Sequence, residues 1–432
     1  MSRSGERRPP AERIVYLPEG DWRDPANYSG TPLFLGRALA RRCRARGVEL
    51  AVVQVPELIN TEPLWRIAEA AIRGRGLRAE VAALPARQRD AAQTAQLVTR
   101  LRGARTWRDA TPLLGSYLDD FTRLTTARLR RVAHARSALL CLNTMNPPWR
   151  AGFRAWYYLD APLAPLYFDE QVGFVRSAAA GPEAVSLFSE VEREAIGRAR
   201  GLLFFSQFAS SACRAAYPSA RGKSHVVGAG ANLGRLPDYR PVDRAGRMRL
   251  LFVGRDFGLK GGDLLLEAAA RLDPARFALT VVTESRFHPR PADRPACASF
   301  RAPVSKAEVA ALYAAHDLFV FPTRLDAFGI VVCEAMAHGM PVLATPVRAI
   351  PEILGRSTPR FDPYVTTATE LVAAIERAAA DPATCRAVGR RNHARAGRRF
   401  DWHGVVDRIL DRILDDEARP NAPATRGTDA TV

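Results

Sequence analysis

Hydrophobic positions along the chain follow two alternating patterns: short apolar runs typical of buried strands, and apolar residues at helical spacing. The first run, residues 13–17, is followed by a polar loop and then by helical spacing over residues 31–46. A second apolar run, residues 49–55, comes directly after this helix. Strand, loop, helix and strand in this order predict a parallel α/β layer, because parallel neighbours need a crossover connection.

The alternation continues to about residue 235, stops, and then starts again. Further strands of the first series are predicted at 138–142, 155–159, 201–205 and 224–227, with helices at 113–136 and 183–200. Residues 236–247 hold two prolines and several charges without apolar periodicity, which indicates a linker. In the second series, strands are predicted at 250–253, 279–282, 318–321 and 341–344, and helices at 262–272, 305–315, 330–336, 367–380 and 402–417. Capping boxes are expected to open two of these helices, with Ser305 pairing with Glu308 and Thr367 with Glu370.

The composition is that of a globular protein, with 47% apolar and 25% charged residues among 432. No apolar run approaches the roughly 20 residues that cross a bilayer, and the charged start has no apolar segment after it, so we expect a cytoplasmic protein. The six cysteines stand apart, without the spacing of a zinc site. The net charge of +18 favours nucleic acid, an anionic membrane surface or phosphorylated small molecules, and charge alone does not choose among them.

The first candidate for chemistry lies between residues 250 and 272, where a buried strand ends at Gly254 and a helix follows Gly261 and Gly262. In open α/β sheets, ligands bind at the carboxyl ends of strands, and a helix start after glycines presents amides to an anion. Arg255 supplies a planar fork and Lys260 a point charge, which together suit a diphosphate. Lys260 is one of only three lysines in the chain. The alternative is an ordinary loop with two solvated cations.

The second candidate follows the strand at 318–321. Asp326 lies in the loop, and Glu334 is placed about one turn into the next helix, where its side chain leans back toward the same loop. Two carboxylates beside the amides of Phe328, Gly329 and Ile330 can accept from sugar hydroxyls and donate to phosphate oxygens. The alternative is an amphipathic helix on which Glu334 is exposed.

These two segments resemble a known family. The stretch DAFGIVVCEAMAHGMPVLAT (residues 326–345) is similar to the E-x7-E signature of the retaining glycosyltransferases of family 4, which belong to the group 1 glycosyltransferases and have the GT-B fold. GRDFGLKGG (residues 254–262) is similar to the phosphate loop of that family. The resemblance covers most of residues 12–415 and is strongest from 249 to 352. It implies two Rossmann-like doubly wound domains that face each other across a cleft.

The resemblance also implies a division of the chain and a role for each domain. We expect a flexible tail, an acceptor domain, a linker, a nucleotide-sugar donor domain, a last helix that packs back on the acceptor domain, and a disordered tail. These parts are placed at residues 1–11, 12–235, 236–247, 248–395, 396–417 and 418–432 respectively.

For the donor site, the resemblance implies that Arg255 and Lys260 bind the diphosphate of a UDP-, GDP- or ADP-sugar, beside Gly254. Glu334 would bind the ribose hydroxyls, and Asp326 would contact the transferred sugar. Asp326 is a departure, because the family more often has Glu there. Backbone groups of Phe328, Gly329 and Ile330 would lie near that sugar. With two cations at the leaving diphosphate and no compact carboxylate motif, neither a metal nor another cofactor is expected.

The amino-terminal half resembles the family more loosely. Gly30 and Thr31 correspond to a glycine-bearing loop that approaches the donor phosphate and the acceptor. Asp160 ends a predicted strand where many members have a catalytic histidine, so it is our candidate on the acceptor side. Ser206 and Asn232 are weaker candidates for lining the cleft. None of the seven histidines is expected to be the general base.

The predicted reaction is retaining transfer of a sugar from a nucleotide diphosphate sugar to a hydroxyl of a glycan, a glycolipid or a small metabolite. Five arginines between residues 390 and 399 form either a solvated helix face or a patch that contacts acceptor phosphate or anionic lipid, the latter at the inner face of the membrane. Two alternatives remain: a basic nucleic-acid-binding protein, which lacks supporting motifs and which we disfavour, and a relative that binds nucleotide sugars without turnover.

Overall fold

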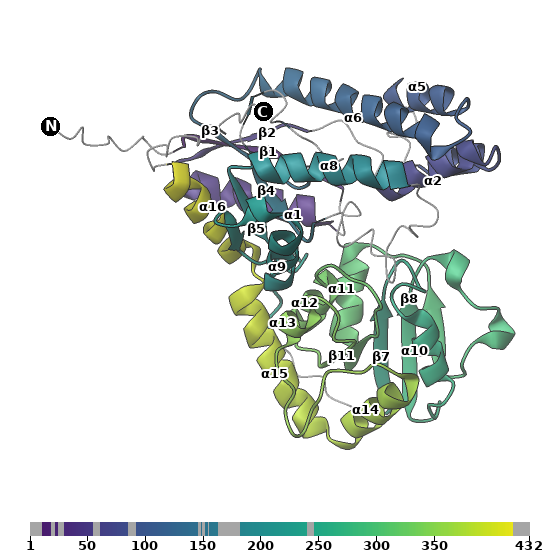
Figure 1. Cartoon of the computed structure of the whole chain (residues 1–432). Helices are drawn as coiled ribbons and strands as arrows, with labels where there is room; N and C mark the ends of the chain where they lie inside the picture. Colours follow the sequence, from purple (N-terminus) through teal and green to yellow (C-terminus); the bar gives the residue numbers. More distant parts are fainter. Residues whose placement is uncertain are drawn as a thin grey trace.

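The protein is described from a computed structural model, which covers residues 11–18, 22–24, 30–54, 61–84, 92–145, 148, 152–153, 155–162, 182–239 and 246–417. Two lobes, each built around a parallel sheet, lie one above the other (Figure 1). Most of the expected amino-terminal tail, residues 240–245 of the expected linker and the whole expected carboxy-terminal tail lie outside the described residues. Ala11, which we had placed in the tail, is buried.

The amino-terminal lobe has a six-stranded parallel sheet of order β2-β1-β3-β4-β5-β6. Its strands are β1 Arg13–Leu17, β2 Glu49–Val52, β3 Ser137–Cys141, β4 Ala155–Leu159, β5 Gly201–Phe204 and β6 Ser224–Val226. The strands were predicted, although β2 ends at Val52, before the expected residue 55. Every residue of β4 is buried, as expected for a central strand covered by helices on both faces.

The helices of this lobe include a group, α2, α3 and α5, that the sequence pattern did not predict. All the helices described in this lobe are α1 Thr31–Ala45, α2 Thr61–Ile72, α3 Leu77–Ala82, α5 Ala92–Leu101, α6 Trp107–Leu129, α8 Pro182–Arg198 and α9 Gln207–Ala216. The α6 helix begins earlier than the predicted residue 113, because Thr106 and Asp109 form a capping box. Helices α2, α5 and α6 bury their apolar faces against one another and against Phe188 of α8, in a core separate from the sheet.

The carboxy-terminal lobe has a five-stranded parallel sheet of order β11-β10-β7-β8-β9. Its strands are β7 Met248–Val253, β8 Phe277–Val282, β9 Ala298–Arg301, β10 Leu318–Phe321 and β11 Val342–Ala344. Its helices are α10 Gly262–Ala269, α11 Lys306–Ala315, α12 Ile330–Ala337, α13 Ile350–Leu354, α14 Ala368–Ala380 and α15 Pro382–Arg399. Both predicted capping boxes are present, at the starts of α11 and α14.

The last helix, α16 Trp402–Glu417, lies on the amino-terminal lobe (Figure 1). Arg42 of α1 and Arg46, which follows that helix, bind Asp407 at 2.8 Å, and Arg46 also binds Asp411 at 2.6 Å. The helix has the predicted bounds, 402–417, but the boundary that we expect at residue 396 is wrong, because α15 continues to Arg399 and the break falls at Phe400 and Asp401.

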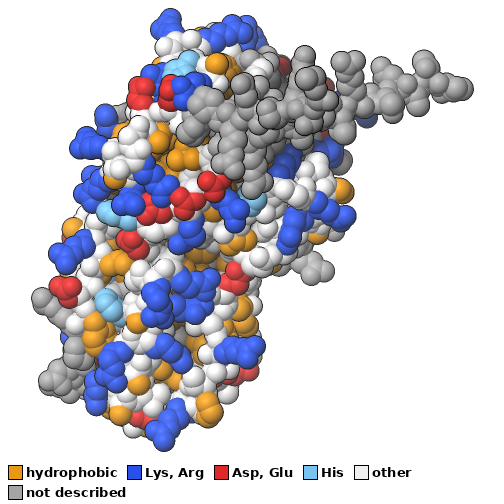
Figure 2. All heavy atoms as spheres, turned by 90° about the vertical axis from the view of Figure 1, so that its left-hand side faces the viewer, with side chains coloured by type: hydrophobic (Ala, Val, Ile, Leu, Met, Phe, Trp, Pro, Cys, Tyr) orange, Lys and Arg blue, Asp and Glu red, His pale blue; other side chains and the backbone are white. Residues whose placement is uncertain are grey.

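The outer surface reflects the net charge. Figure 2 shows the face on the side of α15 and α16, where Lys and Arg side chains are spread over both lobes and outnumber Asp and Glu. Among the described residues, no helix combines the length and apolarity that a membrane span requires.

Candidate active site

A cavity of about 510 Å³ lies between the two lobes, at the carboxyl ends of strands from both sheets. The carboxy-terminal lobe contributes most of its charged lining, and the amino-terminal lobe contributes neutral side chains and Asp160. The predicted site residues that line this cavity are Thr31, Asp160, Gly254, Arg255, Lys260, Asp326, Phe328, Gly329, Ile330 and Glu334. Two segments about 70 residues apart in the sequence therefore meet in one cavity.

Lys260 is held at the floor of this cavity by the neighbouring loop. Its ammonium donates to the backbone oxygen of Leu325 at 2.7 Å and to Oδ2 of Asp326 at 2.9 Å, and it lies 5.9 Å from the ring centre of Phe321. An ammonium has three donors, so these two contacts orient Lys260 and leave one donor for a ligand. Arg255, at the end of β7, is exposed and lines the same cavity.

The helix start that we had expected at this phosphate loop does not serve as the anion site. The amides of Gly261 and Gly262 donate inside the loop, to Gly258 at 3.1 Å and to Phe257 at 2.7 Å, and neither residue lines the cavity. Gly261 has a φ of 74°, and a Cβ there would lie 1.8 Å from the backbone oxygen of Pro322. These glycines allow close packing between the loop and β10, which is a structural role.

A different helix start, that of α12, lies at the cavity. Gly329 precedes the helix with a φ of 102° and has no side chain to cap it, and the amides of Ile330 and Val331 have no acceptor among the described residues. The φ of 102° strains any other residue at this position, and a Cβ there would also lie 2.6 Å from Cδ1 of Ile350. Gly329, Ile330 and Val331 all line the cavity, so an anion or a hydroxyl there meets backbone donors.

Asp326 organises the loop before α12. One carboxylate oxygen accepts from Lys260, and the other accepts from the amide of Phe328 at 3.1 Å. The Phe328 ring packs edge-on against Phe205 of the other lobe, with ring centres 5.6 Å apart. Asp326 thus joins the two predicted segments and holds Phe328 at the contact between the lobes.

Glu334 is buried, with 1% of its surface exposed, so the alternative of an amphipathic helix with an exposed Glu is wrong. Lys306 donates to one carboxylate oxygen at 2.8 Å, and the Tyr313 hydroxyl donates to the other at 3.1 Å. Burial raises the pKa of the Glu334 carboxyl, and the Lys306 ammonium and the Tyr313 hydroxyl partly offset this effect. Each carboxylate oxygen can accept a further hydrogen bond from a ligand in the cavity.

Lys306 is a site residue that we did not predict. It is the first residue of α11, and it lines the cavity beside Glu334. The signal was available in the composition, because the chain has three lysines and two of them, Lys260 and Lys306, lie at this cavity. The third, Lys223, donates to the backbone oxygens of Gly197 and Ala199 at the end of α8.

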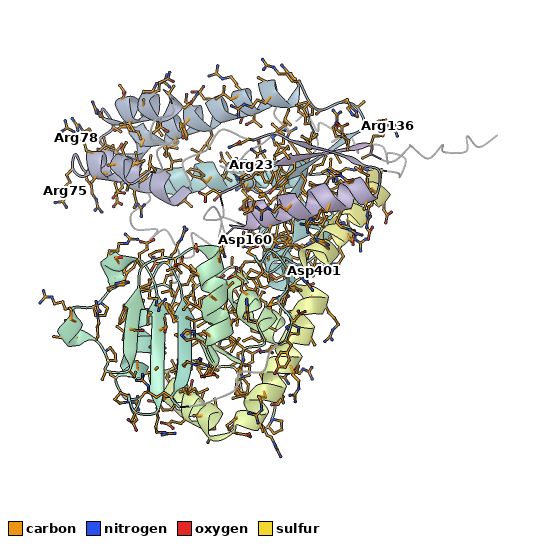
Figure 3. The ribbon with its side chains drawn as sticks, turned by 180° about the vertical axis from the view of Figure 1, so that it is seen from behind. Arg23, Arg75, Arg78, Arg136, Asp160 and Asp401 are labelled. Carbon is orange, nitrogen blue, oxygen red and sulfur yellow. The ribbon has the colours of Figure 1, made fainter. Side chains whose placement is uncertain are left out.

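The amino-terminal candidates are placed unequally. Gly30 is the left-handed residue before α1, with a φ of 92°, and Thr31 is the first residue of that helix and lines the cavity. Gly30 does not itself line the cavity, and Ser29 of the predicted loop lies outside the described residues. Asp160 lies at the end of β4, between the two lobes (Figure 3).

Ser206 and Asn232 do not line the cavity. The Ser206 hydroxyl caps α9 by accepting from the amide of Ala209 at 3.1 Å, so its role is structural. Asn232 is buried and bridges Thr31 and Trp402.

Other charged candidates also have structural partners. In the basic run of α15, Arg395 and Arg399 donate to the backbone oxygens of Glu352 and Ile353 and so hold α13. The rings of His316 and His338 bind backbone oxygens of their own helices. In the part of the chain that the structure describes, no three His, Cys, Asp or Glu side chains are grouped as a metal site.

Comparison with known proteins gives a match to one family model, described as glycosyl transferases group 1, over residues 247–381. Two curated relatives are D-inositol 3-phosphate glycosyltransferases. The protein of Segniliparus rotundus is 31% identical over 44% of this chain and 46% of its own length. The protein of Mycolicibacterium smegmatis is 27% identical over 64% of this chain and 69% of its own length. The chain thus spans about half the length of the first curated relatives that it matches.

Solved structures match over nearly the whole chain. Sucrose-phosphate synthase from Thermosynechococcus elongatus has a TM-score of 0.62 at 18% identity, covering 92% of this chain and 97% of that one. WaaG, involved in lipopolysaccharide biosynthesis, has a TM-score of 0.57 at 17% identity, covering 93% and 99%. HepE from Anabaena in complex with UDP-glucose has a TM-score of 0.58 at 15% identity, covering 93% and 99%. The predicted GT-B fold is confirmed.

Proposed function

We propose that the protein is a retaining glycosyltransferase that uses a nucleotide diphosphate sugar, because residues 247–381 match the group 1 glycosyltransferases and the chain has the GT-B fold. One observation carries the proposal: Arg255, Lys260, Asp326 and Glu334 line a single cavity between the two lobes. Its volume, about 510 Å³, suits a small-molecule ligand. Neither nucleic-acid binding nor binding without turnover is favoured by the comparisons.

In this proposal the diphosphate lies beside Gly254, Arg255 and Lys260. When the anomeric C–O bond breaks, negative charge grows on the leaving diphosphate and the sugar becomes oxocarbenium-like. Cations that are already oriented stabilise that charge at little reorganisation cost, and the contacts of Lys260 with Leu325 and Asp326 provide this orientation. The two cations can do this without a metal ion or another cofactor.

The other end of the donor lies against α12. We assign the ribose hydroxyls to Glu334, whose buried carboxylate is kept in place by Lys306 and Tyr313. The transferred sugar is assigned to Asp326 and to the backbone of Phe328, Gly329 and Ile330. That HepE is described with UDP-glucose supports a nucleotide-sugar donor of this kind.

The acceptor is assigned to the face of the cavity made by the amino-terminal lobe. Asp160, at the end of β4, is its charged group, and we assign Thr31, at the start of α1 after Gly30, to both the acceptor and the donor phosphate. We assign the proton of the acceptor hydroxyl to the leaving phosphate, as the resemblance to the family implies. The acceptor classes are a glycan, a lipid-linked glycan or a small metabolite.

We place the protein in the cytoplasm, with contact to the inner face of the membrane if the acceptor is lipid-linked. The net charge of +18 supports attraction to anionic lipid. Cosedimentation with vesicles of anionic lipid, against neutral vesicles, tests this contact separately from activity.

The proposal is tested by measuring thermal stabilisation with UDP-, GDP- and ADP-sugars, followed by transfer to glycan and lipid acceptors with the sugar that stabilises most. We expect stabilisation by one nucleotide class and its loss in Glu334→Ala. Wild-type protein that none of these nucleotides stabilises would overturn the proposal. Stabilisation without transfer or donor hydrolysis would instead support a binding protein.

A further inference from the structure

Three residues from different parts of the chain form a buried hydrogen-bonded series that ends at the cavity. The indole Nε1 of Trp402 donates to Oδ1 of Asn232 at 3.1 Å, and Nδ2 of Asn232 donates to Oγ1 of Thr31 at 3.1 Å. Asn232 is 1% exposed and Trp402 is 5% exposed. Thr31 is the member of the series that lines the cavity.

The direction of these hydrogen bonds follows from chemistry. An indole nitrogen can only donate, so the Asn232 atom that faces Trp402 must be its oxygen. The Asn232 amide nitrogen then faces Thr31, and the Thr31 oxygen must accept from it. The hydroxyl proton of Thr31 is therefore left to donate elsewhere, and the described residues offer it no acceptor.

Packing prevents the series from reversing. A Cβ at Gly230 would lie 2.4 Å from the Trp402 ring, so the indole is seated directly on that backbone. The amide of Ala231 donates to the backbone oxygen of Phe400 at 2.7 Å and joins the same two segments. If the Asn232 amide turned over, its NH₂ would face the indole N–H, which would leave two buried donors unpaired.

We infer that Asn232 and Trp402 are positioning residues that make the Thr31 hydroxyl an obligate hydrogen-bond donor to a phosphate oxygen in the cavity. This inference rests on the proposed function. A phosphate oxygen is the fitting acceptor, because it only accepts and because Arg255, Lys260 and Lys306 line the same cavity. Asn232 and Trp402 touch no substrate and act through Thr31.

The decisive variant is Asn232→Asp, studied at pH 8. A carboxylate of the same shape accepts from Trp402 and also from the Thr31 hydroxyl, which would turn the lone pairs of Thr31 toward the phosphate. We expect the affinity for the best-binding nucleoside diphosphate, measured by calorimetry, to fall about tenfold or more, as for the loss of a hydrogen bond to a charged group.

Variants at Thr31 keep the test valid if Asn232→Asp does not fold. Thr31→Val should lose about as much affinity, while Thr31→Ser should bind like wild type, because only the hydroxyl matters. In the double variant Asn232→Asp/Thr31→Val, the losses should not add, since both act on one hydroxyl. Trp402→Phe keeps the ring but removes the N–H and should give a smaller loss.

The outcomes separate this inference from the proposed function. Wild-type protein that binds no nucleotide would refute both. Wild-type protein that binds a nucleotide while Thr31→Val binds it equally well would overturn the inference alone. Unchanged affinity in a folded Asn232→Asp protein would do the same.

Discussion

The two lobes contribute to one cavity in different ways. From the carboxy-terminal lobe come Arg255, Lys260, Lys306, Asp326 and Glu334, all in loops or helix starts that follow the carboxyl ends of strands. From the amino-terminal lobe come mainly neutral residues, which include Thr31, Leu142, Tyr158 and Phe205. Residues of both faces lie at or after strand ends, and the two faces differ mainly in charge. Variants of the charged residues should affect turnover most.

The largest effect is expected for Lys260→Ala. Removing an oriented cation from the leaving diphosphate should lower kcat about 100-fold or more. Steady-state transfer kinetics measure this loss. Lys223→Ala is the matched control, since that lysine binds backbone oxygens at the end of α8 away from the cavity and should retain wild-type kcat. A Lys260→Ala enzyme whose kcat stayed within threefold of wild type would show that the cations of the carboxy-terminal lobe do not stabilise the leaving diphosphate.

A second prediction concerns the charge on Glu334. Because burial raises the pKa of this carboxyl, nucleotide affinity should fall as pH is lowered through that raised pKa, whereas Glu334→Gln should bind more weakly and with little pH dependence. Lys306→Met removes the cation that partly offsets burial, so its affinity should be lost at a higher pH than that of wild type. Calorimetry between pH 5 and 8 tests the order of the three curves. A Lys306→Met curve that coincided with that of wild type would show that the ion pair does not control the ionisation of Glu334.

A third prediction concerns a direct bond between the lobes. The carboxylate of Glu352, on α13, accepts from the amides of Gln207 and Phe208 at 2.8 and 2.6 Å, at the start of α9. Glu352→Ala should therefore speed hydrogen exchange at these two amides and raise KM a few-fold, with a smaller effect on kcat. Glu376→Ala is the control, because Glu376 pairs with Arg276 inside the carboxy-terminal lobe. Unchanged exchange at α9 would mean that this contact does not hold the lobes together.

The smallest effect is expected for Asp407→Asn on α16. Although burial raises the pKa of Asp407, its bonds to Arg42 and Arg46 lower it overall. The carboxylate therefore stabilises the fold above the ordinary pKa of 3.8, and that stabilisation is lost as pH falls through the lowered pKa. Thermal unfolding at pH 7 should show a loss of about 0.5 to 1 kcal/mol, which shrinks at high salt. A difference from wild type that persisted below pH 3 would point to packing instead of charge.

How far the sequence predicts this molecule depends on the kind of contact. The strands at 13–17 and 318–321 and both capping boxes were predicted correctly, because their signals span a few consecutive residues. The group α2, α3 and α5 was missed, since short amphipathic helices that pack on each other lack the regular alternation with strands. The expected anion site at the start of α10 was wrong. Glycine spacing does not reveal whether the amides are already used, as those of Gly261 and Gly262 are.

The order of residues along the chain was enough to establish two α/β lobes and to single out Arg255, Lys260, Asp326 and Glu334. Each follows a strand end, and in a parallel sheet all such ends lie at one edge. Folding in three dimensions alone decided that Lys306 pairs with Glu334, that Glu352 binds the other lobe, and that Trp402 orients Asn232 toward Thr31. These contacts join residues 28 to 201 positions apart, and side-chain hydrogen bonds across such separations leave no periodic trace in the sequence.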